Sequence, residues 1–131
     1  CTGGGGIPVV KSDDGLLQGV EAVIDKDLGA ERLATLLGAD NLVILTDVNG
    51  AALNYKTPDG RVWLGETNLP ELAEFLKQGH FLSGSMAPKV RAIIRFIQNG
   101  GKMAVIASLD KVEEAVEGKT GTRLRGHLKN Q

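Results

Sequence analysis

Cysteine, net charge and long apolar runs are all scarce in this sequence. Cys1 is the only cysteine among 131 residues, so no intrachain disulfide can form and no thiolate metal site is indicated. The formal net charge is -1, which gives no bulk electrostatic reason to expect binding to nucleic acid or to a membrane surface. No apolar run approaches the ~20 residues that a membrane-spanning helix needs. We therefore expect a cytoplasmic protein that binds neither nucleic acid nor membrane.

An initiating methionine and a signal peptide are absent as well, because the chain opens with Cys-Thr-Gly-Gly-Gly-Gly. We expect it to begin inside a longer parent sequence. Its length predicts one domain over residues 1–131. Hydrophobic residues make up 42% and charged residues 24%, a balance that is ordinary for a domain with a buried core.

Short apolar runs alternate along the chain with segments of helical spacing. We predict strands at residues 7–11, 20–24, 42–45, 51–55, 103–107 and 122–124, the last at a sheet edge. We predict helices at residues 27–37, 69–78, 87–98 and 109–116, with Asn68 and Ser85 as the caps of the second and third. This alternation predicts an α/β fold with a mostly parallel sheet covered on both faces. Ligands of such sheets bind where the strands end, which directs attention to the Gly-rich start and to the loops after Leu45 and Ala107.

The run Gly3-Gly4-Gly5-Gly6 is the first candidate for binding a phosphate. Glycines let the backbone approach a ligand closely and aim several N–H groups at one anion. A flexible junction would carry the same run, and no Gly-Lys-Ser/Thr follows to make it a Walker A loop. Taken alone, the run favours a junction over a site.

Two lysines fall at the expected starts of helices. Lys26 stands between Asp25 and Asp27, and Lys89 follows the segment 84–88 in the first turn of the third helix. A cation is disfavoured at a helix N-terminus, and a bound polyphosphate would reverse that penalty. Lysines can offset the charge of a phosphoryl group in transfer, and an aspartate can hold a lysine or a metal. The alternatives are a helix cap with a surface ion pair around Lys26 and a solvated side chain at Lys89.

Polar residues also end the apolar strand at 42–45. Thr46 and Asp47 suit contacts to a ribose or a phosphate, although Asp47 as a simple turn cap is the alternative. Tyr55 either covers an adenine or fills the edge of the core. His80 and His127 have no carboxylate or thiol at metal-ligand spacing, so we expect surface or structural roles and no protein metal site. In combination with the lysines and glycines, Asp47 predicts a site for nucleotide phosphates.

Several long segments strengthen this interpretation because they occur together and in order. They are CTGGGGIPV (1–9), GVEAVIDKDL (19–28), VILTDVNGAAL (43–53), GHFLSGSMAPKV (79–90), AIIRFIQNGGK (92–102) and EGKTGTRL (117–124). In these segments the sequence resembles carbamate kinase, of the amino-acid kinase superfamily. The resemblance extends to about Leu124 and corresponds to the C-terminal half of that family.

The resemblance implies a three-layer α/β/α fold and reversible phosphoryl transfer between ATP and carbamate, usually run as ADP plus carbamoyl phosphate giving ATP. It implies ATP or ADP with Mg²⁺ as cofactors, a homodimeric parent enzyme and a place in arginine metabolism. The implied catalytic residues are Lys26, Asp27 and Lys89. The implied nucleotide and phosphate contacts are Gly3, Gly4, Gly5, Asp47, Tyr55, Ser85 and Met86.

Members of this family are longer than the present chain. The resemblance implies that the N-terminal half of the family, which this sequence does not match, carries a Gly loop, another phosphate-binding lysine and much of the carbamate pocket. Because transfer requires both substrates to be positioned, we expect the chain alone to be inactive or a weak nucleotide binder, with bare sheet edges that invite dimerisation. Two alternatives remain: an inactive nucleotide-binding module, and another amino-acid kinase acting on a carboxylate or a nucleotide monophosphate. The segment 79–89 favours carbamate kinase over the latter.

Overall fold

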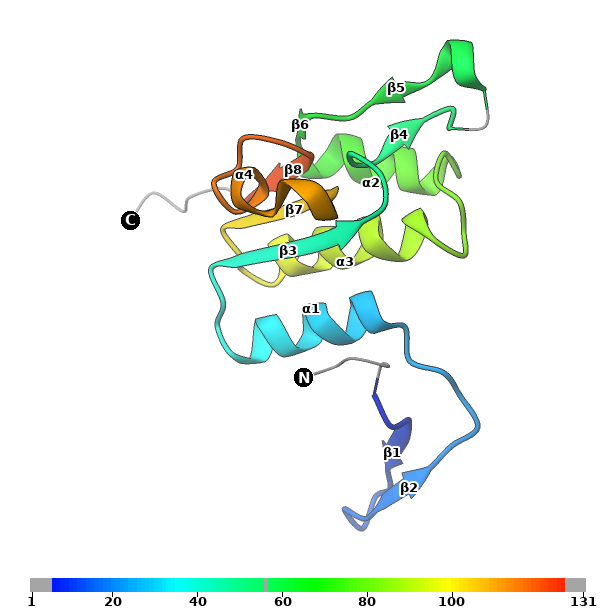
Figure 1. Ribbon diagram of the computed structural model, residues 1–131. Coiled ribbons are helices and arrows are strands. Elements are labelled where there is room, and N and C mark those ends of the chain that lie inside the picture. The colour runs from blue at the N-terminus through cyan, green and yellow to red at the C-terminus, as the bar shows by residue number, and fades with distance from the viewer. Residues whose placement is uncertain (1–5, 56, 127–131) are drawn as a thin grey trace.

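The computed structural model describes residues 6–55 and 57–126, in which strands and helices alternate (Figure 1). The helices are α1 (Lys26–Leu36), α2 (Leu69–Lys77), α3 (Met86–Gln98) and α4 (Val112–Val116), with 3₁₀ turns at Pro58–Gly60 and Leu109–Lys111. The strands are β1 (Val9–Lys11), β2 (Leu17–Gly19), β3 (Asn41–Thr46), β4 (Ala52–Leu53), β5 (Val62–Trp63), β6 (Glu66–Thr67), β7 (Met103–Ser108) and β8 (Thr122–Arg125). The predictions for α1, α2, α3, β3 and β7 are confirmed. None of the helices in the described part of the chain is long and apolar enough to cross a membrane.

The main sheet has the strand order β3-β7-β8-β6. β3 and β7 run parallel, with Asn41 opposite Met103 and Thr46 opposite Ser108. β6 and β8 are also parallel, whereas β7 and β8 are antiparallel. The predicted α/β class is therefore confirmed, and the sheet is mixed because one of its pairings is antiparallel.

The prediction that residues 122–124 form an edge strand is wrong, because β8 lies between β7 and β6. Its two arginines give the segment the polar alternation that is typical of an edge. The side chains that alternate with them, Thr122 and Leu124, are completely buried. Both arginines reach the carboxylate of Glu66 on β6, at 3.6 and 3.5 Å, so their charges are accommodated beside a neighbouring strand.

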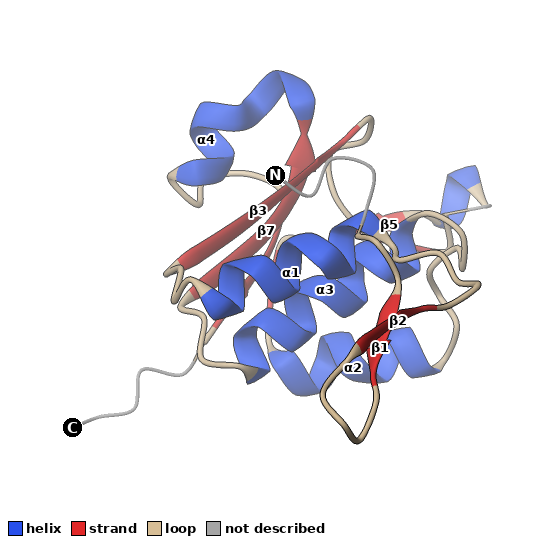
Figure 2. Ribbon diagram, turned by 90° about the horizontal axis from the view of Figure 1, so that it is seen from below, coloured by secondary structure: helices blue, strands red, loops and turns tan. Residues whose placement is uncertain are grey.

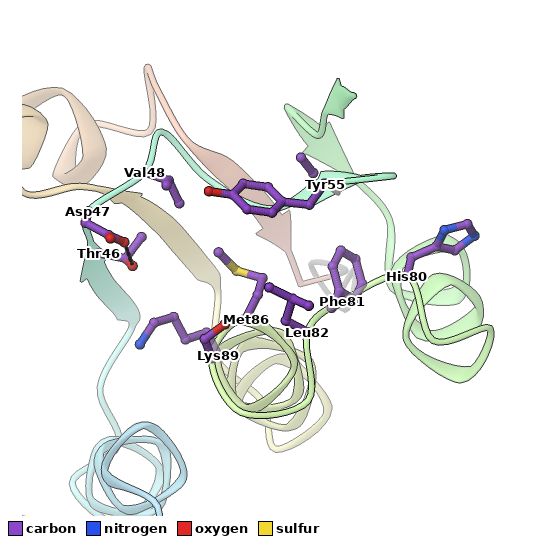
Figure 3. A pocket seen from close by; sticks show the side chains of 11 residues that line it. Thr46, Asp47, Val48, Tyr55, His80, Phe81, Leu82, Met86 and Lys89 are labelled. Atoms are coloured by element: carbon purple, nitrogen blue, oxygen red, sulfur yellow. Dashed lines mark hydrogen bonds between the residues drawn. The ribbon is translucent and has the colours of Figure 1, made fainter. Parts of the chain in front are cut away.

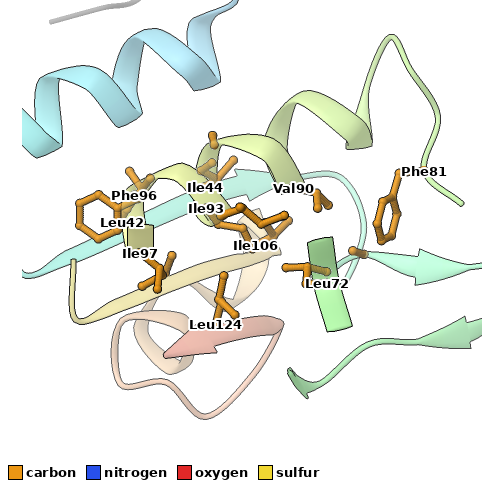
Figure 4. Close-up of a cluster of buried hydrophobic side chains, with 14 of the residues drawn as sticks. Leu42, Ile44, Leu72, Phe81, Val90, Ile93, Phe96, Ile97, Ile106 and Leu124 are labelled. Carbon is orange, nitrogen blue, oxygen red and sulfur yellow. The ribbon is translucent and has the colours of Figure 1, made fainter. Parts of the chain in front are cut away.

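Helices cover both faces of this sheet. α1, α2 and α3 lie on one face and α4 lies on the other, which confirms the three-layer architecture (Figures 1 and 2). Every residue of β7 is buried, as expected for a central strand with an almost continuously apolar sequence. The main core packs α3 against the sheet (Figure 4). Its largest fully buried side chains include Leu72, Ile93, Phe96, Ile106 and Leu124.

The N-terminal region differs most from the prediction. β1 pairs antiparallel with β2 in a hairpin that projects away from the main sheet, and the predicted strand at 20–24 is a loop (Figure 1). The turn between β1 and β2 explains the pairing. Gly15 has a φ of 87°, and both the Ser12 hydroxyl and the backbone N–H of Leu16 donate to the carboxylate of Asp14. These two hydrogen bonds favour the charged form and lower the pKa of Asp14.

The residues that helix α1 buries are charged, although its sequence also contains leucines. Asp25 caps the helix, because its carboxylate accepts hydrogen bonds from the backbone N–H groups of Asp27 at 2.8 Å and Leu28 at 3.1 Å. The buried residues of α1 are Asp27 and Glu31, whereas Leu36 near its end is 68% exposed. The helix predicted from the apolar periodicity is confirmed, but the two residues that α1 buries are acidic, and the apolar Leu28 and Ala34 are only partly buried.

β4 and β5 form a small antiparallel arm beside the main sheet (Figure 1). The two ends of the arm meet at Thr122 on β8. The buried Thr122 hydroxyl accepts from the N–H of Ala51 at 2.8 Å and donates to the carbonyl of Leu64 at 2.6 Å. The N–H of Leu64 also donates to the carbonyl of Ala51 at 2.9 Å. One buried hydroxyl thus joins both ends of the arm to the sheet.

The substitution Thr122→Val should lower the free energy of unfolding by about 1–3 kcal/mol, because it deprives a buried N–H and a carbonyl of their partner. Thr122→Ser is the matched control, since it keeps the hydroxyl and loses one methyl group, at a cost of about 1 kcal/mol. Urea unfolding followed by circular dichroism measures both losses. If valine were tolerated as well as serine, the hydroxyl would not be what secures the arm.

Candidate functional site

A cavity of about 180 Å³ opens at the carboxyl end of β3, where the loop into β4 faces the start of α3 (Figure 3). Its position agrees with the general rule for ligands of α/β sheets. The lining residues are Thr46, Asp47, Val48, Ala52, Tyr55, His80, Phe81, Leu82, Ser85, Met86 and Lys89. The structure thus brings together five of the residues that the sequence singled out: Asp47, Tyr55, Ser85, Met86 and Lys89.

One end of the cavity is polar. Asp47 directly follows β3 and Lys89 stands in the first turn of α3, and both lie at this end with Thr46 (Figure 3). Thr46 Oγ1 donates to Asp47 Oδ1 at 3.1 Å and so orients the carboxylate. The ammonium group of a lysine can bind phosphate oxygens directly, and a neighbouring carboxylate can bind them through a metal ion.

The prediction that the Ser85 side chain caps α3 is wrong. Ser85 occupies the N-cap position, but its side chain makes no capping hydrogen bond. The carbonyl of Leu82 instead accepts from the N–H of Ala87 at 3.0 Å, and Pro88 has no N–H to satisfy. The loop backbone therefore replaces the cap, and Ser85 contributes to the wall of the cavity.

Lys89 is held by Asp27 across the contact between α3 and α1. Lys89 Nζ donates to Asp27 Oδ2 at 2.8 Å, and each side chain is only 11% exposed. Burial of two charges costs free energy, and the attraction between them offsets that cost only when the geometry is good. The ion pair therefore fixes the ammonium group of Lys89 at the polar end of the cavity.

A second buried carboxylate, Glu31, lies one turn further along α1. Its Oε1 accepts from Thr35 Oγ1 at 2.9 Å and from Asn99 Nδ2 at 3.0 Å. Its Oε2 is 3.3 Å from Arg95 Nε, a charge contact that lacks the geometry of a hydrogen bond. Sequence reasoning missed Glu31, although its spacing of four residues from Asp27 places both on one face of α1.

Of the other predicted site residues, Lys26 and Asp27 do not line the cavity. Lys26 is exposed in the first turn of α1 and is not part of the cavity wall. Asp27 reaches the cavity only through its bond to Lys89. Gly3, Gly4 and Gly5 lie outside the described residues.

The other end of the cavity is apolar, with Tyr55 and Phe81 in its wall (Figure 3). Sequence reasoning missed Phe81, and it assigned His80 a surface or structural role without placing it at a site. His80 lines the cavity, with Nε2 at 3.1 Å from Gln78 Oε1 and its ring edge-on to Phe75 at 5.7 Å. His80 and Phe81 belong to the loop between α2 and α3, where no pattern of charged residues in the sequence indicates a site.

Carboxylates that could bind a metal are few. Within residues 6–55 and 57–126, no group of three or more His, Cys, Asp or Glu side chains could hold a metal ion. Asp27 is committed to Lys89, which leaves Asp47 in the cavity. Mg²⁺ commonly takes one or two carboxylates from a protein and further oxygens from a substrate's phosphates. The residues present therefore fit a Mg²⁺ ion that is bound together with a phosphorylated ligand.

Known proteins resemble this chain over nearly all of its length. Residues 3–108 match the amino acid kinase family. The chain is 58% identical over 124 residues to a carbamate kinase of Thermococcus kodakarensis and 52% identical over 124 residues to one of Giardia intestinalis. These alignments cover 95% of this chain but 39% and 38% of the two relatives. The chain thus spans about two-fifths of the length of the curated relatives it matches.

Solved structures show the same relationship. Carbamate kinase from Giardia lamblia bound to AMP-PNP superposes with a TM-score of 0.86 at 50% identity, over 94% of this chain and 42% of that one. A crystal structure from Aeropyrum pernix K1 has a TM-score of 0.84 at 48% identity, over 95% of this chain and 39% of that one. N-acetylglutamate synthase from Neisseria gonorrhoeae, at 20% identity and a TM-score of 0.64 over 90% and 26% of the two chains, is similar in fold alone.

The substitutions Asp27→Asn and Lys89→Met should each lower the free energy of unfolding by about 3–5 kcal/mol, because each leaves a buried charge without its partner. The double variant should lose less than the sum of the two single losses, since it buries no unpaired charge. Chemical denaturation of the four proteins measures this coupling.

The surface ion pair between Lys102 and Asp40 provides the control. Its N–O distance is 2.9 Å, almost that of the buried pair, but both side chains are 64% exposed. Asp40→Asn should therefore change the free energy of unfolding by less than about 1 kcal/mol. Similar losses at the buried and the exposed pair would show that burial does not set the strength of the α1–α3 contact.

Proposed function

The chain belongs to the amino acid kinase family, and we propose that it supplies the nucleotide and phosphate site of a carbamate kinase. Such an enzyme transfers a phosphoryl group reversibly between ATP and carbamate, so that ADP and carbamoyl phosphate give ATP in the reverse direction. The observation that carries the proposal is the cavity that gathers Lys89, Asp47 and Tyr55 where β3 ends. Similarity to carbamate kinases supports the choice of reaction.

In this proposal the nucleotide lies along the cavity. Its base lies against Tyr55 and Phe81, because aromatic rings offer flat apolar surfaces for stacking. Its phosphates extend to Lys89 and Asp47, where charge-assisted hydrogen bonds and a Mg²⁺ ion are favourable. The cavity of about 180 Å³ is smaller than most ligand pockets, which occupy roughly 300–1,000 Å³, so part of the nucleotide projects beyond it.

The lysines carry the transfer step in this scheme. Lys89 and Lys26 screen the oxygens of the phosphoryl group as it moves between donor and acceptor, and no covalent protein intermediate is needed. Asp27 holds the Nζ atom of Lys89 at 2.8 Å and thereby orients it. Asp47 would hold Mg²⁺ together with phosphate oxygens, and the ion would neutralise part of the phosphate charge.

The proposal assigns the acceptor side of the reaction to residues outside this chain. Phosphoryl transfer depends on holding both substrates in one geometry, and this chain matches about two-fifths of each relative. β3 is an outer strand of the described sheet and offers an edge for pairing with another segment or copy. We place the parent enzyme in the cytoplasm as a homodimer in arginine metabolism, as its family resemblance implies.

The isolated 131-residue chain should bind ADP but form no ATP from ADP and carbamoyl phosphate, because it holds one substrate without the other. Isothermal titration calorimetry measures the binding, and a luciferase assay measures ATP. ATP formation by the chain alone would refute the division of the site. A longer protein that contains this chain, binds ADP and makes no ATP would favour an inactive nucleotide-binding module instead.

In an enzyme that contains this chain, Lys26→Ala should lower turnover by about 10²–10³-fold, the effect typical of losing one group that stabilises a transition state. Its affinity for ADP should change far less, because the base and the other phosphate contacts remain. Lys77→Ala, at an exposed position in the last turn of α2, is the control and should keep full turnover. Undiminished steady-state rates for Lys26→Ala would remove Lys26 from the mechanism.

A further inference from the structure

The guanidinium of Arg61 lies over the ring of Tyr55 in the β4–β5 arm. Its guanidinium carbon lies 4.4 Å from the ring centroid of Tyr55 and 5.7 Å from that of Trp63. Arg61 Nη2 also donates to the backbone carbonyl of Tyr55 at 3.1 Å. Trp63 completes the cluster, because its ring lies edge-on to Tyr55 at 6.4 Å with an angle of 81° between the planes. Both the ring and the backbone of Tyr55 are therefore restrained by the same guanidinium.

Arg61 acts from outside the cavity. Tyr55 is part of the cavity wall and Arg61 is not, although the guanidinium carbon lies over the Tyr55 ring. No carboxylate in the described ranges forms an ion pair with Arg61, and its Nε is buried without a hydrogen-bond partner. A buried unpaired N–H is unfavourable, and the contact with the two aromatic rings offsets that cost.

We propose that Arg61 is a positioning residue for nucleotide binding that acts through Tyr55. This inference rests on the proposed function, in which the base stacks on the Tyr55 ring. A ring that is already held in place loses less conformational freedom when the base binds, so more of the stacking energy contributes to affinity. Without Arg61, the ring would be free to leave the cavity wall, and the base would have to order it.

The competing explanation is that the positive charge of Arg61 simply attracts the phosphates. The substitution Arg61→Lys distinguishes this explanation from positioning of Tyr55. Lysine keeps the positive charge but lacks the planar guanidinium that stacks on a ring while donating a hydrogen bond in its own plane. If Arg61 positions Tyr55, Arg61→Lys should behave like Arg61→Leu. If Arg61 only attracts anions, Arg61→Lys should behave like the wild type.

Titration calorimetry of the chain with ADP tests the proposal. Both Arg61→Leu and Arg61→Lys should weaken ADP binding by about tenfold, within the range that stacking of a base on an aromatic ring contributes. Arg91→Leu, at an exposed position on α3, is the matched control and should leave the affinity unchanged. In the enzyme that contains this chain, the KM for ADP should rise by the same factor while kcat stays within about twofold, because the lysines at the phosphate end are untouched.

A spectroscopic measurement reports the ring position directly. Tyr55 is the only tyrosine and Trp63 the only tryptophan of the chain, so the near-ultraviolet circular dichroism of both types arises from this cluster. The two Arg61 variants should lose much of that signal while the far-ultraviolet spectrum, which reports secondary structure, stays the same. Arg61→Lys changes the packing least and keeps the test available if the leucine variant does not fold.

The possible failures can be told apart. If the wild type binds ADP and both Arg61 variants bind it equally well, the positioning role is overturned and the proposed function stands. Full recovery of affinity by lysine overturns the positioning role in favour of simple charge. If the wild-type chain does not bind ADP, the proposed nucleotide site falls, and the role of Arg61 falls with it.

Discussion

The contact between α1 and α3 depends on buried charges that have to be paired. Asp27 binds Lys89, and Glu31, one turn further along α1, lies against Arg95, six residues further along α3. An unpaired charge in such a place would cost several kcal/mol, so the helices favour the relative register that brings each carboxylate to a cation. Lys89 also stands where the dipole of α3 disfavours a cation, and Asp27 compensates for that penalty. The place of the Lys89 ammonium group in the cavity follows from this register.

α3 links the charged contact to the hydrophobic core. Beside Lys89, the same helix carries Val90, Ile93 and Ile97, which are buried in the core between α3 and the sheet. Rotation of α3 would expose this apolar stripe and separate the buried ion pair at once. The polar end of the cavity is therefore built on one of the best-supported elements of the fold. At its apolar end, Tyr55 is carried by the β4–β5 arm, which is joined to the sheet by the Thr122 hydroxyl and contains Arg61.

The elements that the sequence predicted well are those whose apolar periodicity reflects their burial, as in α3 and β7. Most of the wrong predictions concern segments in which polar or charged side chains are buried. Thr122 and the arginines of β8 give an inner strand the polar pattern of an edge strand. The burial of Glu31 in α1 cannot be recognised from the sequence without knowing its partners, Arg95 on α3 and Asn99 just after it. The strand predicted at 20–24 failed because strand pairing is decided by turn chemistry and partners, which an apolar run does not encode.

The candidate site was accessible to sequence reasoning only in part. Asp47 and Lys89 could be found because each stands at the end of a recognisable element, where a charged side chain is conspicuous. Phe81 and His80 could not, because they lie in a loop whose residues are ordinary for a turn and enter the cavity wall only through the tertiary fold. The contact of Arg61 with Tyr55 depends on the conformation of the arm, which no pattern in the sequence reveals.

The two ends of the cavity are supported in different ways, and this difference bears on how the site would work. Transfer of a phosphoryl group is sensitive to small displacements of the groups that stabilise it, which suits a lysine locked by a buried ion pair on a core helix. Binding of a base tolerates more adjustment, which suits an aromatic ring on a small arm. Changes in the α1–α3 contact should therefore act on catalysis and stability together, whereas changes in the arm should act on affinity. If the site has the proposed function, changes in the arm would alter its affinity for the nucleotide without disturbing Lys89.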